Sequence, residues 1–226
     1  MNKSDLRVLL VDDHELILKG ILDTFHAIGI RTVHTEKNCD KAFLSYKIAR
    51  DKGDPFDLVF TDLSFDRSEE WDIKSGETLM RSIRNLGNPP PIGVITGHAE
   101  TNRLYNVIKN QIPDAYILKH DCSQAELELA VIKMLRGEHY YSHEVHQKIM
   151  NRKLIDIRMD DSSLEILRQL SKQYKISNMV GVIKNKKGKE LSLRSIDNRL
   201  AELRADLNAV NNIDLVVKAK ELGVID

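Results

Sequence analysis

The first 137 residues alternate short apolar runs with stretches of helical periodicity, and this alternation limits the possible folds more than any other feature. Neighbouring parallel strands need long crossover connections, which are usually helices. The pattern therefore predicts a doubly wound α/β domain, with a five-stranded parallel sheet and helices on both faces. The predicted strands are Leu6–Val11, Ile30–His34, Phe56–Thr61, Ile92–Thr96 and Ala115–Leu118.

From Met159 onward the strand pattern ends, and apolar residues recur only at helical spacings of three and four. Gly223 follows the last of these stretches, as expected of a residue that stops a helix. Residues 138–158 are polar and mostly compatible with a helix, and they are predicted to form a linker. We expect an α/β domain over residues 1–137, this linker, and an all-α domain over residues 159–226. The helices predicted in the second domain contain Leu164–Leu170, Ile176–Ile183, Ile196–Leu207 and Ile213–Leu222.

The formal net charge is zero, with 34 basic and 34 acidic residues, but this charge is divided unevenly along the chain. Residues 1–146 hold 18 basic and 23 acidic residues, a charge of −5. Residues 147–226 hold 16 basic and 11 acidic residues, a charge of +5. The basic half fits a domain that approaches a polyanion, although a solvated basic surface would have the same charge.

Cysteine and histidine positions give weaker predictions. Cys39 and Cys122 match neither zinc nor thioredoxin spacing, so we expect reduced thiols in a reducing compartment. No apolar run is long enough to cross a membrane, which favours a cytoplasmic protein without a membrane partner. His139, His143 and His146, at spacings of four and three, could present imidazoles to a metal on one helical face, but the sequence is not the HExxH motif of a metalloprotease.

Polar residues with complementary chemistry follow four of the predicted strands. Asp12 and Asp13 follow the first strand, Asp62 the third, Thr96 ends the fourth, and Lys119 follows the fifth. Ligands of such sheets bind outside the carboxyl ends of the strands, so these side chains should meet. Two carboxylates about 4 Å apart repel by about 4 kcal/mol at an effective dielectric of about 20, so positive charge must share the site. Mg²⁺ and the Lys119 ammonium would together form a receptacle for a phosphoryl group.

The motifs VLLVDDHE, LVFTDLS, GVITGHA and AYILKHD resemble those of the receiver domain of two-component response regulators, over roughly residues 5–137. The resemblance implies that a sensor histidine kinase phosphorylates Asp62. It also implies that Asp13 and the backbone carbonyl of Ser64 join Asp62 around Mg²⁺, with Asp12 helping through water. Lys119 would bind the phosphoryl oxygens. Beyond its own phosphorylation and slow dephosphorylation, such a protein is not an enzyme.

The same resemblance implies a switch, in which Thr96 moves toward the phosphoryl group and Tyr116 turns inward. Two features depart from the usual receiver pattern. The segment 63–75 after the acceptor is long, charged and free of proline, and in this it resembles the branch of regulators that includes RcsB. His120 follows the lysine, where many receivers have proline.

A phosphatase of the haloacid dehalogenase type uses similar groups and is the rival interpretation of the first domain. In that family the nucleophile lies on the first strand and a second acid follows two residues later. Here Asp12 and Asp13 are adjacent, and the best nucleophile candidate, Asp62, follows the third strand. The spacing therefore favours the receiver.

The segment Leu135–Val145 resembles the receiver end of the NarL/FixJ subfamily, and Leu193–Leu207 is similar to the recognition helix of its LuxR-type helix-turn-helix output. Asn212–Ile225 is similar to the closing helix of that output. The resemblance implies a regulator that binds promoter DNA, as a homodimer when active. The candidate base contacts are Arg194, Asn198 and Arg199, and the candidate phosphate contacts are Lys186, Lys187 and Lys189.

A protein-interaction output that does not bind DNA directly is the alternative for the second domain. Asp197 places a negative charge on the helix that would face DNA, and eight residues separate Ile183 from Ser192, where a helix-turn-helix usually has about 3–4. In this interpretation helix 192–207 contacts a partner regulator or polymerase.

Overall fold

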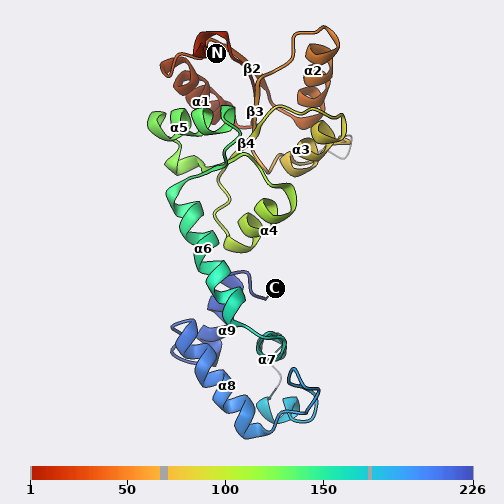
Figure 1. Ribbon diagram of the computed structural model, residues 1–226, viewed down its shortest axis with the longest axis vertical. Helices are drawn as coiled ribbons and strands as arrows, with labels where there is room; N and C mark the ends of the chain where they lie inside the picture. The colour runs from red at the N-terminus through yellow and green to blue at the C-terminus, as the bar shows by residue number, and fades with distance from the viewer. Residues whose placement is uncertain (1, 67–70, 173–174, 226) are drawn as a thin grey trace. The chain divides into compact units, whose positions relative to one another are not determined.

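The computed structural model describes residues 2–66, 71–172 and 175–225 (Figure 1). The chain divides into two compact units, residues 1–99 with 106–146, and residues 100–105 with 147–226. Each unit has its own hydrophobic core. No helix in the described part of the chain is both long and apolar enough to cross a membrane.

The first unit is built on a parallel sheet with the strand order β2-β1-β3-β4-β5-β6, and this confirms the predicted fold class. Every neighbouring pair is parallel, for example Leu9 beside His34 and Thr61 beside Val94. The buried strands β1, β3, β4 and β5 carry almost continuous apolar runs, as expected when helices cover both faces. The strands are β1 (Arg7–Val11), β2 (Thr32–Glu36), β3 (Leu58–Thr61), β4 (Ile92–Thr96), β5 (Ala115–Leu118) and β6 (Tyr140–Tyr141).

Helices lie on both faces of this sheet. Helices α1 (Glu15–Ala27) and α5 (Gln124–Leu135) pack together on one face, and α2 (Cys39–Asp51) and α3 (Gly76–Asn85) on the other (Figure 1). Helix α4 (Thr101–Gln111) links β4 to β5. The side chains of Asn38, Ser75 and Ser123 accept hydrogen bonds from backbone N–H groups at the starts of α2, α3 and α5, which fixes where each helix begins.

Segment 138–158, predicted to be a linker, contains regular structure. Strand β6 adds a sixth strand to the sheet, with Tyr140 beside Ala115 and Tyr141 beside Tyr116. Helix α6 (His143–Arg158) follows, and Val145 and Ile149 are buried on it. A two-residue strand carries too little periodicity to be recognised in a sequence.

The second unit is helical, as predicted, with helices α7 (Asp161–Ser171), α8 (Leu193–Asp206) and α9 (Asn212–Glu221). Ile166, Leu200 and Leu215 contribute to its core. The side chains of Asp160, Ser192 and Asn211 cap the three helices. Gly223 has a φ of +66° just after α9, as expected of a helix stop.

The helix predicted over 176–183 is wrong. Only one 3₁₀ turn, η3 (Ile176–Met179), forms there, because Val180 is extended and Gly181 has a φ of +79°. The chain then turns back on itself, with Lys184 paired to Glu190 in an antiparallel bridge. A short hairpin, residues 184–190, therefore stands directly before α8.

Candidate functional site

The carboxyl ends of β1, β3 and β5 bring Asp12, Asp62 and Lys119 together. Lys119 Nζ lies 2.7 Å from Asp12 Oδ2 and 2.7 Å from Asp62 Oδ2. Both carboxylates are buried, and the lysine side chain is mostly so. The backbone N–H of His14 donates to the other oxygen of Asp12, and that of Leu63 donates to the other oxygen of Asp62. The two carboxylates are thus held rigidly on a single shared ammonium.

The charges of this triad do not cancel, because two carboxylates face one ammonium. Burial raises the pKa of Asp12 above its ordinary value, although Lys119 and the N–H of His14 act against it. Burial also opposes the charge of Lys119, but its contacts with Asp12 and Asp62 outweigh this and raise the pKa of Lys119. Lys119 therefore stays protonated, and two carboxylates share one positive charge. Such a site favours a further cation.

Asp13 lies beside this triad. Together, Asp12, Asp13, Asp62 and Lys119 form an acidic site at the carboxyl end of the sheet, here called the acidic mouth. The Oδ2 of Asp13 accepts a hydrogen bond from the backbone N–H of Asp66 (2.6 Å), and its Oδ1 lies 2.7 Å from His14 Nδ1. Asp12, Asp13 and His14 offer ligand atoms within 4.8 Å of one another. Carboxylate oxygens are the ligands that Mg²⁺ prefers, so the donors present fit this ion. Ser64 lies two residues after Asp62 and pairs with Ser75 in an antiparallel bridge.

Thr96 and Tyr116 both contact the backbone of His98. Thr96 is fully buried at the end of β4, and its Oγ1 accepts a hydrogen bond from the N–H of His98 (3.3 Å). Tyr116 is also fully buried, and its hydroxyl donates to the carbonyl of His98 (3.3 Å). The aromatic ring therefore already lies in the inward position that the resemblance assigns to the switched state, and the backbone of His98 connects it to Thr96.

Gly76 is a site residue that the sequence reasoning missed. A Cβ atom at this position would lie 1.8 Å from the backbone oxygen of Asp62, so the first turn of α3 packs directly on the residue that follows β3. The N–H of Gly76 also donates to the carbonyl of Leu63 (3.2 Å). The pair Ser75-Gly76, a helix-capping residue followed by a residue without a side chain, is the signal that could have identified it.

The long segment after Asp62 is anchored at both of its described ends. Phe65 and Ile73 are buried, and Asp40 accepts hydrogen bonds from the backbone N–H groups of Asp72 (3.1 Å) and Ile73 (3.0 Å). Residues 67–70 of this predicted loop lie outside the described residues. Helix α2, through Asp40, therefore helps to position the rim of the acidic mouth.

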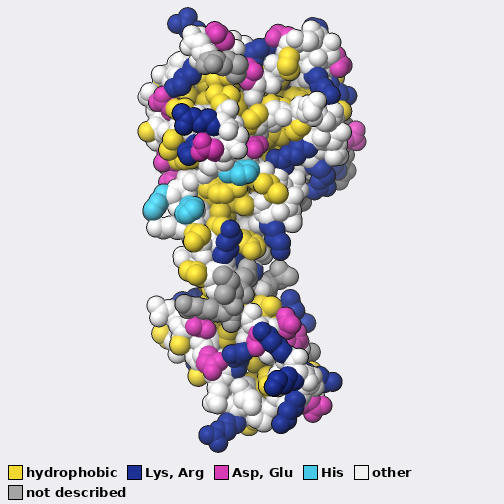
Figure 2. All heavy atoms as spheres, viewed as in Figure 1, with side chains coloured by type: hydrophobic (Ala, Val, Ile, Leu, Met, Phe, Trp, Pro, Cys, Tyr) yellow, Lys and Arg dark blue, Asp and Glu magenta, His cyan; other side chains and the backbone are white. Residues whose placement is uncertain are grey.

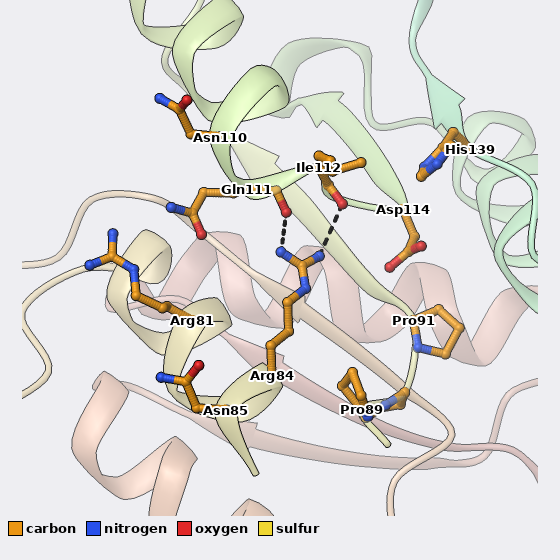
Figure 3. Close-up of a pocket in the computed structure, with 11 residues that line it drawn as sticks. Arg81, Arg84, Asn85, Pro89, Pro91, Asn110, Gln111, Ile112, Asp114 and His139 are labelled. Atoms are coloured by element: carbon orange, nitrogen blue, oxygen red, sulfur yellow. Dashed lines mark hydrogen bonds between the residues drawn. The ribbon is translucent and has the colours of Figure 1, made fainter. Parts of the chain in front are cut away.

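A second cavity, of about 620 Å³, lies at the opposite edge of the sheet, before the first residues of β4, β5 and β6 (Figure 3). The Arg84 guanidinium donates there to the carbonyls of Gln111 and Ile112, the latter at 3.0 Å (Figure 3). Arg84 thus binds the carboxyl end of α4, where backbone carbonyls lack helical partners. Of the residues predicted as metal ligands, His139 lines this cavity, and the residues of the predicted phosphoryl site do not.

In the second unit, most of the residues predicted to contact DNA are exposed, and one, Arg199, is held in ion pairs. Arg194 and Asn198 are exposed in the amino-terminal half of α8, and Lys186, Lys187 and Lys189 are exposed on the hairpin before it. Figure 2 shows basic side chains on the visible face of this unit, with acidic ones among them.

Arg199, by contrast, is half-buried and forms ion pairs with Asp160 and with Glu202, the latter at 2.8 Å. Burial raises the pKa of Asp160, but hydrogen bonds from Ser163 and Ser162 and the charge of Arg199 lower it to about 2. Arg199 therefore joins α8 to the capping residue of α7.

The predicted histidine cluster does not form. Helix α6 begins only at His143, so His139 lies outside the helix, where its ring stacks on Tyr141. Among the described residues, no grouping of metal-ligand atoms contains His139, His143 and His146 together. Cys39 and Cys122 are free thiols, in agreement with the sequence analysis.

Comparisons with known proteins agree with this geometry. The RcsB structure with two dimers bound to two parallel DNAs is 20% identical, with 96% of this chain and 98% of that chain covered and a TM-score of 0.60. RcsB of Salmonella typhimurium is 20% identical, with 97% and 99% covered and a TM-score of 0.61. An RcsB–DNA complex is 20% identical, with 96% and 98% covered and a TM-score of 0.58. These likenesses show a shared fold.

A comparison with curated protein sequences gave no match. The model of the response regulator receiver domain matches residues 8–132, which is more than half of the chain and includes every member of the acidic site. This chain belongs to the response regulator receiver domain family.

Proposed function

We propose that this protein is a DNA-binding response regulator of a two-component phosphorelay, with Asp62 as its phosphoacceptor. The observation that carries the proposal is the Lys119 ammonium shared between two buried carboxylates. A sensor histidine kinase would supply the phosphoryl group. An oxygen of Asp62 would form the new bond to phosphorus as the bond from phosphorus to the kinase histidine breaks.

The residues around Asp62 have distinct roles in this reaction. Lys119 would pair with a phosphoryl oxygen, and the Thr96 hydroxyl would donate to another. Mg²⁺ would be held by Asp13, Asp62 and the carbonyl of Ser64, with Asp12 acting through water, and when bound it neutralises charge on the transferring group. Apart from accepting and slowly losing this group, we assign the protein no enzymatic turnover.

The contacts of His98 suggest how phosphorylation would reach the rest of the receiver. If Thr96 turned toward a phosphoryl oxygen, its hydroxyl would leave the N–H of His98, the residue whose carbonyl holds Tyr116. Thr96, His98 and Tyr116 would then rearrange together. Such a change would favour dimerisation or release the second unit.

For the second unit we propose binding to promoter DNA. The exposed Arg194 and Asn198 are suited to base edges, and the lysines of the 184–190 hairpin to phosphates. The RcsB structures with DNA and the +5 charge of residues 147–226 support this proposal. Because Arg199 is already held by two carboxylates, we assign it a supporting role behind the contact surface.

A homodimer fits both the DNA and the surface of α9. Ile213 and Val217 are 78% and 47% exposed and lie four residues apart on one side of this helix, and Val210, 84% exposed, lies just before the capping residue Asn211. An exposed apolar stripe of this kind marks an interaction surface. A second copy would cover it when two units bind half-sites about one helical turn apart on the DNA. Contact with both a kinase and a promoter would place the protein in the cytoplasm.

Direct interaction with a partner protein is the second candidate, because Asp197 is exposed on α8. Selection from a random duplex pool, with the full chain treated with a small phosphodonor and Mg²⁺, separates the two. Enrichment of a two-part motif supports DNA binding. A pool that stays random, together with binding to a polymerase subunit or partner regulator, supports the alternative.

A further inference from the structure

His120, Asp121 and Glu144 form a second group of metal-ligand side chains, distinct from the acidic mouth. His120 and Asp121 belong to the 3₁₀ turn η2 (Lys119–Asp121), and Glu144 lies in the first turn of α6. Their ligand atoms all lie within 4.8 Å of one another. We propose that these three side chains bind a divalent transition-metal ion of the zinc type.

The spacing of the donor atoms fits a tetrahedral ion. His120 Nε2 lies 3.0 Å from Glu144 Oε2 and 3.5 Å from Asp121 Oδ1. Zinc bonds of about 2.0–2.1 Å at tetrahedral angles separate neighbouring ligand atoms by about 3.3 Å. The two measured distances lie on either side of this value, so an ion can enter with small side-chain movements.

The donor types select among metals. Imidazole nitrogen suits zinc, cobalt and nickel, whereas Mg²⁺ and Ca²⁺ prefer oxygen alone. One imidazole with two carboxylates supplies three protein ligands and leaves the fourth position to water, as in open zinc sites. All three side chains are partly exposed, so an ion can reach them from solvent.

Asp121 is held in the orientation that a ligand needs. Its Oδ2 accepts a hydrogen bond from Ser142 Oγ (3.3 Å), while Oδ1 is the oxygen near His120. Ser142 is fully buried, and its N–H donates to the carbonyl of Tyr116 (3.0 Å), so this support is part of the sheet. Fixed second-sphere hydrogen bonds of this kind orient metal-bound carboxylates.

A metal here would fasten the first turn of α6 to the turn that carries Lys119. Since Lys119 contacts Asp62, occupancy of this site and phosphorylation of Asp62 should influence each other, and the influence must be reciprocal at equilibrium. Only this coupling rests on the proposed function. Binding of the metal itself depends on His120, Asp121 and Glu144 and on the support of Asp121 by Ser142, and it does not depend on phosphorylation.

The test is a Zn²⁺ titration of the full chain by calorimetry, with excess Mg²⁺ present to fill the acidic mouth. Co²⁺ titration, followed by its visible absorption, reports nitrogen and oxygen coordination. We expect one site per chain in the wild type and a loss of affinity of at least about tenfold in His120→Ala and in Glu144→Gln. Ser142→Ala should weaken binding by roughly tenfold, as loss of a second-sphere partner does.

His146→Ala is the matched control, because His146 is exposed on the same helix and is outside the cluster. Its affinity should equal that of the wild type. Circular dichroism melting of each variant separates lost ligands from lost folding. Unchanged affinity in His120→Ala, or a loss caused by His14→Ala instead, overturns the proposal. Phosphorylation of Asp62 is measured separately by mass, so its failure would leave the zinc result intact.

Discussion

Lys119 Nζ lies 2.7 Å from Asp62 Oδ2, and the same ammonium lies 2.7 Å from Asp12 Oδ2. A buried lysine is thus shared by two carboxylates that follow strands adjacent in the sheet. Two buried carboxylates on one ammonium leave a surplus negative charge, and a buried charge without a full counter-charge is costly. This shared contact makes the acidic site a source of chemistry and also of instability.

Asp12→Asn should increase the free energy of unfolding at neutral pH, by about 1–2 kcal/mol, because burial disfavours the charged carboxylate and Asp62 remains to pair with Lys119. The pKa of Asp12 is raised in the folded state, so the wild type gains stability as pH falls through that pKa toward the ordinary value of 3.8. The advantage of the variant should therefore shrink on acidification. Urea unfolding at several pH values measures this difference in the free energy of unfolding. A variant less stable than the wild type at neutral pH would contradict the claim that burial disfavours the charged Asp12.

Gly76→Ala should damage both stability and phosphorylation. The added Cβ would lie 1.8 Å from the carbonyl oxygen of Asp62, so the backbone must move, at a cost of about 1–3 kcal/mol. Gly20→Ala is the matched control, since nothing lies within 4 Å of its Cβ and Gly20 is inside α1. That variant should gain about 0.5–1 kcal/mol. Chemical denaturation measures the free energy of unfolding of both variants. Equal changes in Gly76→Ala and Gly20→Ala would show that Gly76 does not pack on Asp62.

Asp160 should make the second unit sensitive to acid. Its pKa is about 2 when folded and 3.8 ordinarily, so it contributes stability above 3.8 that is lost as pH falls toward 2. The shift corresponds to about 2 kcal/mol. Asp160→Asn should remove this stability and flatten the pH dependence of unfolding between these values. If the free energy of unfolding of the variant fell with pH between 3.8 and 2 as it does for the wild type, Asp160 would not be held by Ser163 and Arg199.

The DNA contacts should differ by type. Arg194→Gln should cost about 1–3 kcal/mol of binding and relax the preference for one base, whereas Lys187→Gln should weaken all sequences alike and lower the salt slope by about 1. Lys220→Gln removes the same charge from an exposed position on α9 and serves as the control. Fluorescence anisotropy over a salt series measures all three. Identical effects of the three substitutions would indicate a general charge effect without a defined contact surface.

Particular elements show how far the sequence could predict this structure. Strands β4 and β5 have the predicted bounds, because both are buried on both faces and are apolar throughout. Strand β2 begins two residues later than predicted, since the buried Ile30 lies in the preceding loop and the strand itself is an exposed edge. Ile176–Ile183 has helical spacing, but the positive φ of Gly181 breaks it, and spacing alone does not reveal that.

The residues of the acidic site could be predicted from the positions of the strand ends better than from any local motif. Asp12, Asp62 and Lys119 meet because parallel strands place their carboxyl ends on one edge of the sheet. Contacts that the strand order does not determine could not be predicted in this way. Arg199 pairs with Asp160, 39 residues away, and Gly76 packs on Asp62 through the folding of the intervening segment.

The most direct test of the central claim is intact-mass analysis of the full chain after incubation with a small phosphodonor and Mg²⁺, for wild type and Asp62→Ala. We predict one phosphoryl adduct on the wild type, lost on removal of Mg²⁺ by chelation before the reaction, and none on Asp62→Ala. Asp66→Ala, which removes an exposed carboxylate nearby, should be phosphorylated like the wild type. An undiminished adduct on Asp62→Ala would contradict the assignment of Asp62 as the acceptor.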